Sequence, residues 1–208
     1  MLQEELTLLL LIGITLYTKQ KQKIMKQFKI AVFVGSLRKE SYNVKTAKAL
    51  IALAPESLSF EIIDISSLPF FNEDLESTPP QEWLTLREQI KAADGVLFLT
   101  PEYNRSVPAV LKNAIDVGSR PYGQNSWNGK PGGVVSVSIG NISGFGANHH
   151  LRQSLVFVNV PAMAQPEAYI GDASRLFDDN GNLTNESTKE FLKDFALAFE
   201  KWVETNAK

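Results

Sequence analysis

Three continuous apolar segments constrain the fold of this chain more than any other feature. They read FKIAVFV at residues 28–34, GVLFLT at 95–100 and GGVVSVSI at 132–139. Unbroken apolar runs of this length are typical of strands buried on both faces of a parallel sheet, whereas a half-exposed strand alternates with polar residues. We therefore predict that these three segments are the central strands of a parallel sheet.

Segments with a helical spacing of apolar residues separate and follow these runs. The last is the clearest, because Phe191, Phe195, Phe199 and Trp202 form an apolar stripe along an otherwise polar segment. Alternation of strands and helices indicates a parallel sheet covered on both faces, here a doubly wound three-layer α/β sandwich. Helices are predicted at residues 43–54, 80–93, 109–118, 150–158 and 187–204, with two further strands at 58–65 and 162–169.

The first 24 residues differ from the rest of the chain. Their apolar run at residues 8–17 is shorter than the roughly 20 residues that a membrane-spanning helix needs. Glu4 and Glu5 precede this run, where a signal peptide carries positive charge. Met25 then opens a natural start for the first strand. We predict that residues 1–24 are an upstream extension outside the fold, with a weak membrane anchor as the alternative, and that residues 25–208 form one domain.

Composition excludes several classes of function. The chain has no cysteine, which excludes disulfides, cysteine-ligated metal sites and a cysteine nucleophile. The two histidines, His149 and His150, are adjacent and point in different directions, so we expect no shared metal ion. We place them near a helix start, partly exposed. The net charge of −2 argues against a dominant nucleic-acid role, which needs a basic face.

The loop after the first strand, VGSLRKESYN at residues 34–43, has the composition of a phosphate site. Ser36, Ser41 and Asn43 supply polar side chains, and Arg38 supplies positive charge. The following helix start supplies backbone N–H groups, which bind anions readily. An ordinary polar loop with a serine or asparagine N-cap would have the same composition. The Walker motif and the dinucleotide-binding glycine pattern are both absent.

The loops after the other two central strands have features of a ring-binding site. Residues 100–116 place Tyr103 and Asn104 between two prolines, which suits a rigid wall for a planar ring. A purely structural loop with Tyr103 at the surface is the alternative. Residues 136–150 contain glycines that permit close backbone approach. Ligands of open α/β sheets bind at the carboxyl ends of the strands, where these loops lie.

Together, GSLRKESYN, PEYNRSVPAVLKNAID and HLRQSLVF resemble the NADPH-dependent FMN reductase family, in the branch with bacterial quinone and chromate reductases. The resemblance extends from about residue 29 to the C-terminus. It implies a flavodoxin-like three-layer sandwich with a five-stranded parallel sheet in the order 2-1-3-4-5. It also implies non-covalent FMN, NAD(P)H as co-substrate and a homodimer or homotetramer. We expect a cytoplasmic protein.

The resemblance also implies which residues contact FMN, and it assigns no catalytic side chain because the flavin carries the chemistry. The implied phosphate positions are Ser36, Arg38, Ser41 and Asn43, with Tyr42 beside them. The implied wall of the isoalloxazine ring is Pro101, Glu102, Tyr103 and Asn104, and Ser138 and Gly140 lie near its pyrimidine edge. Two segments depart from the family pattern. Glu40 replaces a common glycine, and ISGFGA at residues 142–147 replaces a double glycine with a following basic residue.

The predicted function is ping-pong hydride transfer from NAD(P)H to FMN and then to a small acceptor such as a quinone, chromate, an azo compound or a flavin. The main alternative is a flavodoxin-type electron carrier, although such carriers are usually strongly acidic. A protein that kept the fold and lost the flavin is the other alternative, which Glu40 alone supports. We expect no metal, no nucleic-acid partner and no membrane partner.

Overall fold

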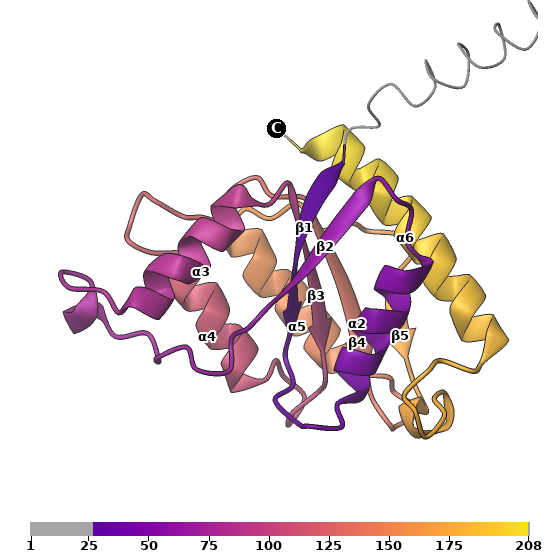
Figure 1. Ribbon diagram of the computed structural model, residues 1–208. Helices are drawn as coiled ribbons and strands as arrows, with labels where there is room; N and C mark the ends of the chain where they lie inside the picture. The colour runs from indigo at the N-terminus through magenta and orange to yellow at the C-terminus, as the bar shows by residue number, and fades with distance from the viewer. Residues whose placement is uncertain (1–26, 208) are drawn as a thin grey trace, which may run out of the picture.

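A five-stranded parallel sheet forms the centre of the computed structural model, which describes residues 27–207 (Figure 1). The strands follow the order β2-β1-β3-β4-β5, and every neighbouring pair is parallel. The predicted α/β sandwich and strand order are therefore confirmed. The strands are β1 (Phe28–Val34), β2 (Leu58–Ile63), β3 (Gly95–Thr100), β4 (Gly132–Val137) and β5 (Ala168–Ile170).

The three apolar runs form the middle of this sheet, as predicted. All residues of β3 and β4 are buried, and Lys29 is the one exposed residue of β1. In register, Ile30 of β1 lies beside Gly95 of β3, and Val96 of β3 lies beside Gly132 of β4. Burial on both faces explains why these segments lack the alternation of a half-exposed strand.

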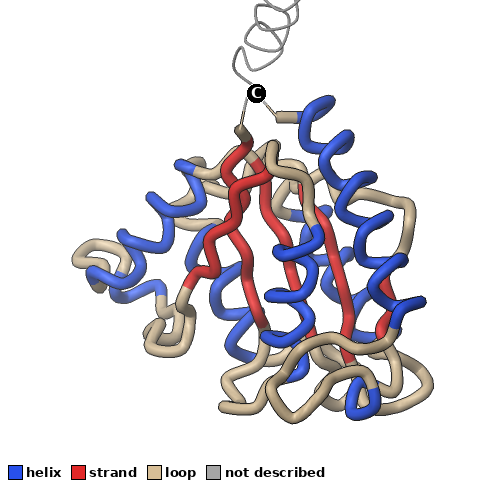
Figure 2. Tube along the Cα trace, turned by 45° about the vertical axis from the view of Figure 1, so that its right-hand side comes forward, coloured by secondary structure: helices blue, strands red, loops and turns tan. Residues whose placement is uncertain are grey.

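Helices cover both faces of the sheet (Figure 2). Residues of α2 and α6 share one buried cluster, and residues of α3, α4 and α5 share the other. Two short 3₁₀ helices, η1 (Glu73–Leu75) and η2 (Ala173–Arg175), lie in the connecting loops. The α-helices are α2 (Tyr42–Leu53), α3 (Gln81–Ala92), α4 (Ala109–Gly118), α5 (Phe145–Phe157) and α6 (Glu186–Asn206).

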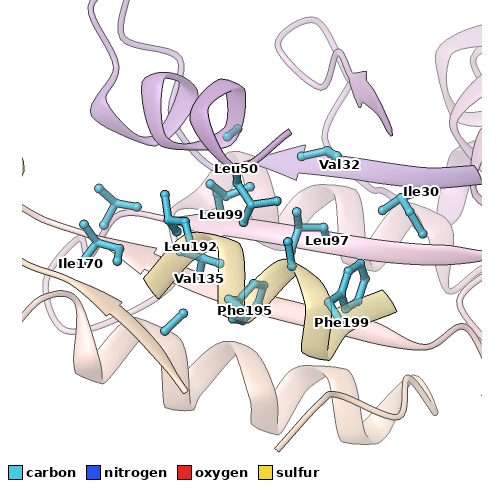
Figure 3. Close-up of a cluster of buried hydrophobic side chains, with 14 of the residues drawn as sticks. Ile30, Val32, Leu50, Leu97, Leu99, Val135, Ile170, Leu192, Phe195 and Phe199 are labelled. Carbon is cyan, nitrogen blue, oxygen red and sulfur yellow. The ribbon is translucent and has the colours of Figure 1, made fainter. Parts of the chain in front are cut away.

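The core on the first face joins α6 to the sheet (Figure 3). Phe195 and Phe199 of α6 are fully buried against strand residues that include Leu97 and Val135. Fully burying one such side chain contributes about 1.5–3 kcal/mol. The apolar stripe seen in the sequence is therefore the face by which the last helix holds the sheet.

The core on the second face is built around Trp127. Its ring lies 5.0 Å from the ring of Phe33 and 5.7 Å from that of Phe98, measured between centroids. Its indole N–H donates to the carbonyl of Ile115 at 3.0 Å. A Cβ atom on Gly118 would lie 2.4 Å from the indole nitrogen, so only glycine fits where α4 ends.

Two boundaries near the C-terminal half differ from the predictions. α5 begins at Phe145 rather than at residue 150, because the glycine-rich stretch forms its first turn. The last strand spans Ala168–Ile170 rather than residues 162–169. Pro161 and Pro166 have no N–H to donate to a sheet, and Ala162 makes a single bridge to Gly132.

The predicted extension at residues 1–24, and its alternative as a membrane anchor, lie outside the described residues. Among residues 27–207, none of the helices has the length and apolar character needed to cross a bilayer.

Candidate functional site

The loops that follow β1, β3 and β4 lie side by side at the carboxyl edge of the sheet, which is the lower edge in Figure 1. The N–H of Gly35 donates to the carbonyl of Leu99 at 2.8 Å, which joins the ends of β1 and β3. The side-chain amide of Asn43 donates to the carbonyl of Val137 at 3.4 Å, which joins α2 to the end of β4. The sheet therefore brings together the three loops predicted to form one site.

Ser41 is the N-cap of α2. Its hydroxyl accepts a hydrogen bond from the N–H of Val44 at 3.3 Å, and the side chain is buried. The first-turn N–H groups of a helix lack intrahelical partners, and the first turn of α2 has no acidic residue to neutralise them. The N-cap interpretation of this loop is confirmed. The phosphate site stays a prediction, with which a capped helix start is compatible.

Arg38 and Glu40 are held by contacts within the same loop. The guanidinium of Arg38 donates to the carbonyl of Glu40 at 3.0 and 2.6 Å and lies 5.0 Å from the centroid of the Tyr42 ring. The carboxylate of Glu40 pairs with the Lys45 ammonium at 3.0 Å and is 69% exposed. This hydrogen bond and the charge of Lys45, with smaller contributions from Lys39 and Arg38, lower the pKa of Glu40. The acidic residue is thus paired and faces solvent.

Asn43 is buried beneath the loop and has one acceptor without a partner. Its Nδ2 is engaged by Val137, while its Oδ1 has no hydrogen-bond partner in the described part of the chain. The amide orientation is set, because a carbonyl oxygen cannot bond to another carbonyl oxygen. An ionised phosphate has no proton to donate to Oδ1, whereas the ribityl chain of FMN carries hydroxyl groups. A buried acceptor of this kind fits the ribityl part of the cofactor.

The tip of the loop after β3 is a tight hairpin turn. The backbones of Tyr103 and Ser106 exchange two hydrogen bonds, at 3.1 and 3.0 Å. Asn104 and Arg105 between them have φ values of 51° and 64°, which is the geometry of a type I′ turn. Pro101 precedes this turn and lies against Gly35, where an added Cβ would be 3.4 Å from the proline ring. Two backbone hydrogen bonds thus hold the tip of the loop, with Tyr103 exposed at its end, and its role as a wall for a ring stays a prediction.

Glu102 links this loop to α5. Its carboxylate accepts from the N–H of Ala147 at 3.1 Å, in the first turn of the helix, and pairs with Arg105 at 3.0 Å. A Cβ atom on Gly146 would lie 3.0 Å from the same carboxylate. The side chain of Glu102 therefore caps a helix, which leaves its backbone, rather than its carboxylate, to face a ligand.

Two buried residues that were not among the predicted site residues, Ser136 and Asn148, hold the loop after β4 in place. The Ser136 hydroxyl donates to the carbonyl of Ser143 at 2.7 Å, and the buried Asn148 amide reaches Ser136 at 3.4 Å. At the loop itself, the N–H of Gly140 donates to the Ser138 hydroxyl at 3.2 Å. The available signal was Ser136, the first of the two serines in the apolar run GGVVSVSI, since a buried polar residue there needs a partner.

The two histidines lie on the exposed side of α5, near its start as predicted. His149 is 3.0 Å from the Tyr169 hydroxyl, and His150 is 2.7 Å from the Ser106 hydroxyl. Burial, and then Glu167, raises the pKa of Tyr169. The histidines thus serve two separate contacts.

Large apolar side chains are exposed in all three loops. Clusters of exposed apolar side chains mark surfaces that bind ligands or partners. A cavity of about 610 Å³ lies elsewhere, between α3 and the β1–β2 pair, but ligands of such sheets bind at the carboxyl ends of the strands. The exposed residues at the loops are Leu37, Tyr103, Ile139, Ile142 and Phe145.

The sequence matches the family described as NADPH-dependent FMN reductase over residues 28–175. The chain belongs to this family. A quinone reductase of Pseudomonas putida is 60% identical over 180 residues, which cover 86% of this chain and 96% of the relative. An NADPH:quinone oxidoreductase of Arabidopsis thaliana is 41% identical over 179 residues, which cover 83% of this chain and 90% of the relative.

A solved structure shows the same fold. It is FerB, a flavoenzyme NAD(P)H:(acceptor) oxidoreductase of Paracoccus denitrificans, with a TM-score of 0.83 and 44% sequence identity. The match covers 87% of this chain and the whole FerB chain. Family membership confirms the predicted enzyme class, with FMN as cofactor and NAD(P)H as co-substrate. The individual FMN contacts stay predictions.

Proposed function

We propose that this chain is an NAD(P)H:quinone oxidoreductase that binds FMN at the carboxyl edge of its sheet and uses its two substrates in turn. The observation that carries the proposal is the meeting of the three loops after β1, β3 and β4. Relatives named quinone reductases support a quinone as the acceptor. Chromate, azo compounds and free flavin are acceptors that the same site would admit.

At the phosphate end, the start of α2 and the side chains of Ser36 and Ser41 would hold the phosphate. Arg38 adds positive charge at this end, although its guanidinium now donates to Glu40. The Tyr42 ring lies 5.0 Å from that guanidinium, measured to its centroid, and would help to hold it in place. Asn43 would receive a ribityl hydroxyl at its unpartnered Oδ1. When bound, FMN supplies hydride acceptance and donation at its ring.

At the ring end, the segment Pro101, Glu102, Tyr103 and Asn104 would form one wall, stiffened by the type I′ turn. Ser138 and Gly140 would lie along the pyrimidine edge. In the structure the N–H of Gly140 donates to the Ser138 hydroxyl at 3.2 Å, and both groups would be available to polar atoms of the ring. These residues bind and orient the ring, and no side chain has to act as a nucleophile.

The decisive experiment is an anaerobic stopped-flow measurement on the purified protein. The protein is expected to be yellow with a flavin absorbance band, and NADPH or NADH should bleach that band. Addition of a quinone should restore it, and steady-state double-reciprocal plots should be parallel. If neither nucleotide bleaches the bound flavin, the proposal is wrong.

The same measurement separates the enzyme from a flavodoxin-type electron carrier. A carrier would hold FMN but would show almost no steady-state NAD(P)H oxidation with a quinone. The net charge of −2 favours the enzyme, because carriers steer to basic partners with strongly acidic surfaces.

We also propose that the protein acts in the cytoplasm as a homodimer or homotetramer. Light scattering of the purified protein should give two or four times the chain mass of 23.1 kDa. A monomer at micromolar concentration would contradict the assembly, and recovery in the membrane fraction would contradict the location.

A further inference from the structure

A cavity outside the flavin site lies between α2 and the turn that precedes α6. Its volume of about 330 Å³ is within the range of about 300–1,000 Å³ that small-molecule sites occupy. The side chains at its wall come from two helices and one turn. They are Lys45, Lys48, Ala49, Ala52, Leu53, Asn180, Gly181, Asn182, Leu183 and Lys189.

The charged groups at this cavity are all positive. Lys45 and Lys48 lie three residues apart on α2, on the same side of the helix, and Lys189 faces them from α6. Lys45 pairs with Glu40 and Lys189 with Glu186, whose carboxylates are 69% and 78% exposed. Exposed pairs of this kind are weak. Within residues 27–207, Lys48 has no ion pair, so an anion entering the cavity would meet one unpaired lysine and two lysines that are paired with exposed carboxylates.

Part of the cavity lining is apolar, and we call these four residues its floor. Ala49, Ala52 and Leu53 of α2 and Leu183 of the turn present small or aliphatic side chains beside the lysines. A site with cations at one side and an apolar floor suits a ligand that joins a phosphate to a flat, uncharged ring. A free inorganic anion would leave the apolar floor in contact with water.

The wall opposite α2 is held by contacts within the turn. Asp178 accepts from the N–H and the side-chain amide of Asn182 at 2.8 and 3.0 Å, and the N–H of Gly181 donates to its carbonyl at 2.9 Å. Gly181 has a φ of 81°, and an added Cβ would be 3.4 Å from Cε of Lys45. This side of the cavity is therefore already ordered before a ligand binds.

Lys45 connects this cavity to the flavin site. Its ammonium pairs with Glu40 of the phosphate loop and lies 5.7 Å from the centroid of the Tyr42 ring. The cavity thus opens about one helical turn from the predicted position of the FMN phosphate. A dinucleotide whose nicotinamide lies on the flavin ring has a second, adenosine end that must lie on nearby protein surface.

We infer that this cavity binds the adenosine end of NADPH, with Lys45, Lys48 and Lys189 around its 2′-phosphate and the adenine on the apolar floor. The inference rests on the proposed function, because the nicotinamide end must reach the flavin. NADH has no 2′-phosphate, so the three lysines favour NADPH over NADH.

Calorimetric titration of the FMN-loaded protein with 2′-AMP tests this inference without any turnover. We expect 2′-AMP to bind more tightly than 5′-AMP, adenosine or inorganic phosphate, and more weakly at high salt. Lys48→Gln and Lys189→Gln should each weaken 2′-AMP binding about tenfold, the effect of losing one charge-assisted contact. Lys193→Gln, an exposed change one turn further along α6, is the matched control and should bind as the parent does.

Equal binding of 2′-AMP and inorganic phosphate would overturn the nucleotide assignment. Equal binding of 2′-AMP and 5′-AMP, or unchanged binding in both lysine variants, would overturn the role of the cavity. These results do not depend on flavin reduction. A protein that reduces its flavin but fails this titration would keep the proposed function and lose the inference. A protein that binds 2′-AMP in the cavity but does not reduce its flavin would lose the proposed function, and the cavity would then be a nucleotide site with no role in hydride transfer.

Discussion

At the residue scale, Ser41 has one role that the structure shows and one that stays a prediction. Its hydroxyl caps α2, and the capped helix start is the predicted phosphate position. The chain alone shows only that a serine precedes a helical segment. That it is buried, with its oxygen directed at the N–H of Val44, follows from the folded structure.

Replacement Ser41→Glu is expected to reduce FMN affinity sharply, because it places a second anion beside the phosphate. Ser41→Ala is the control, since it removes the cap at a cost of about 1 kcal/mol without adding charge. The measurements are the flavin-to-protein ratio after desalting and the dissociation constant for FMN. Unchanged flavin content in Ser41→Glu would show that the phosphate binds elsewhere.

Glu40 shows how a residue that conflicts with the site in sequence can be accommodated in the fold. An acidic side chain in a phosphate loop repels the ligand if it points inward. Lys45, one helical turn further along, draws the carboxylate outward and lowers its pKa. The Arg38 guanidinium donates to the backbone carbonyl of Glu40 and contacts the Tyr42 ring, and it does not pair with the Glu40 carboxylate.

At the scale of elements, Asn113 of α4 fixes the long loop that follows β2. Its buried side chain accepts from the N–H of Phe71 at 2.8 Å and donates to the carbonyls of Leu68 and Pro69 at 3.2 and 3.1 Å. Loops of this length need such anchors, because a backbone away from water must satisfy its polar groups.

Replacement Asn113→Ala is expected to lower the free energy of unfolding by about 1–3 kcal/mol, since it leaves buried backbone groups without partners. Residues 66–80 should then exchange their amide protons faster than in the parent. Gln153→Ala, at an exposed position of α5, is the control and should change stability by less than about 0.5 kcal/mol. A parent-like denaturation midpoint for Asn113→Ala would contradict the anchoring role.

At the scale of the whole molecule, the strand order determines where the site lies. The chain leaves β1, forms β2 on one side, and returns to form β3 on the other side of β1. The loops after β1 and β3 therefore lead to helices on opposite faces of the sheet, and ligands of such sheets bind at this point. The end of β4 lies beside them, where Val137 accepts from Asn43.

Removal of FMN is expected to lower the melting temperature, because a ligand that binds only the folded state stabilises it. At a free concentration of 100 times the dissociation constant, the gain is about 2.7 kcal/mol. Thermal melts of the flavin-free protein with added FMN measure this effect. Riboflavin, which lacks the phosphate, is the control and should restore less stability at equal concentration. Equal rescue by both would contradict a phosphate site at α2.

Much of this architecture was predictable from local sequence. The runs at 28–34 and 95–100 match β1 and β3, and the helix prediction at 109–118 matches α4. These matches hold because burial on both faces of a strand, or along one side of a helix, leaves a periodic pattern in the chain itself. A different argument, from the composition of the loops at the carboxyl ends of the strands, predicts where a ligand binds.

Other features depended on contacts between distant segments. α5 begins at Phe145 because Glu102, in the loop after another strand, accepts from Ala147 and stabilises a glycine-rich first turn that has little helical preference of its own. Local patterns in the chain were enough to predict the class of fold, the central strands and the polar loops at their ends. The folded structure was needed to show where α5 starts, which way Arg38 and Glu40 point, and that three lysines from α2 and α6 line one cavity. The physical reason is that burial leaves a local pattern, whereas the partner of a polar or charged group is set by which segments the sheet brings together.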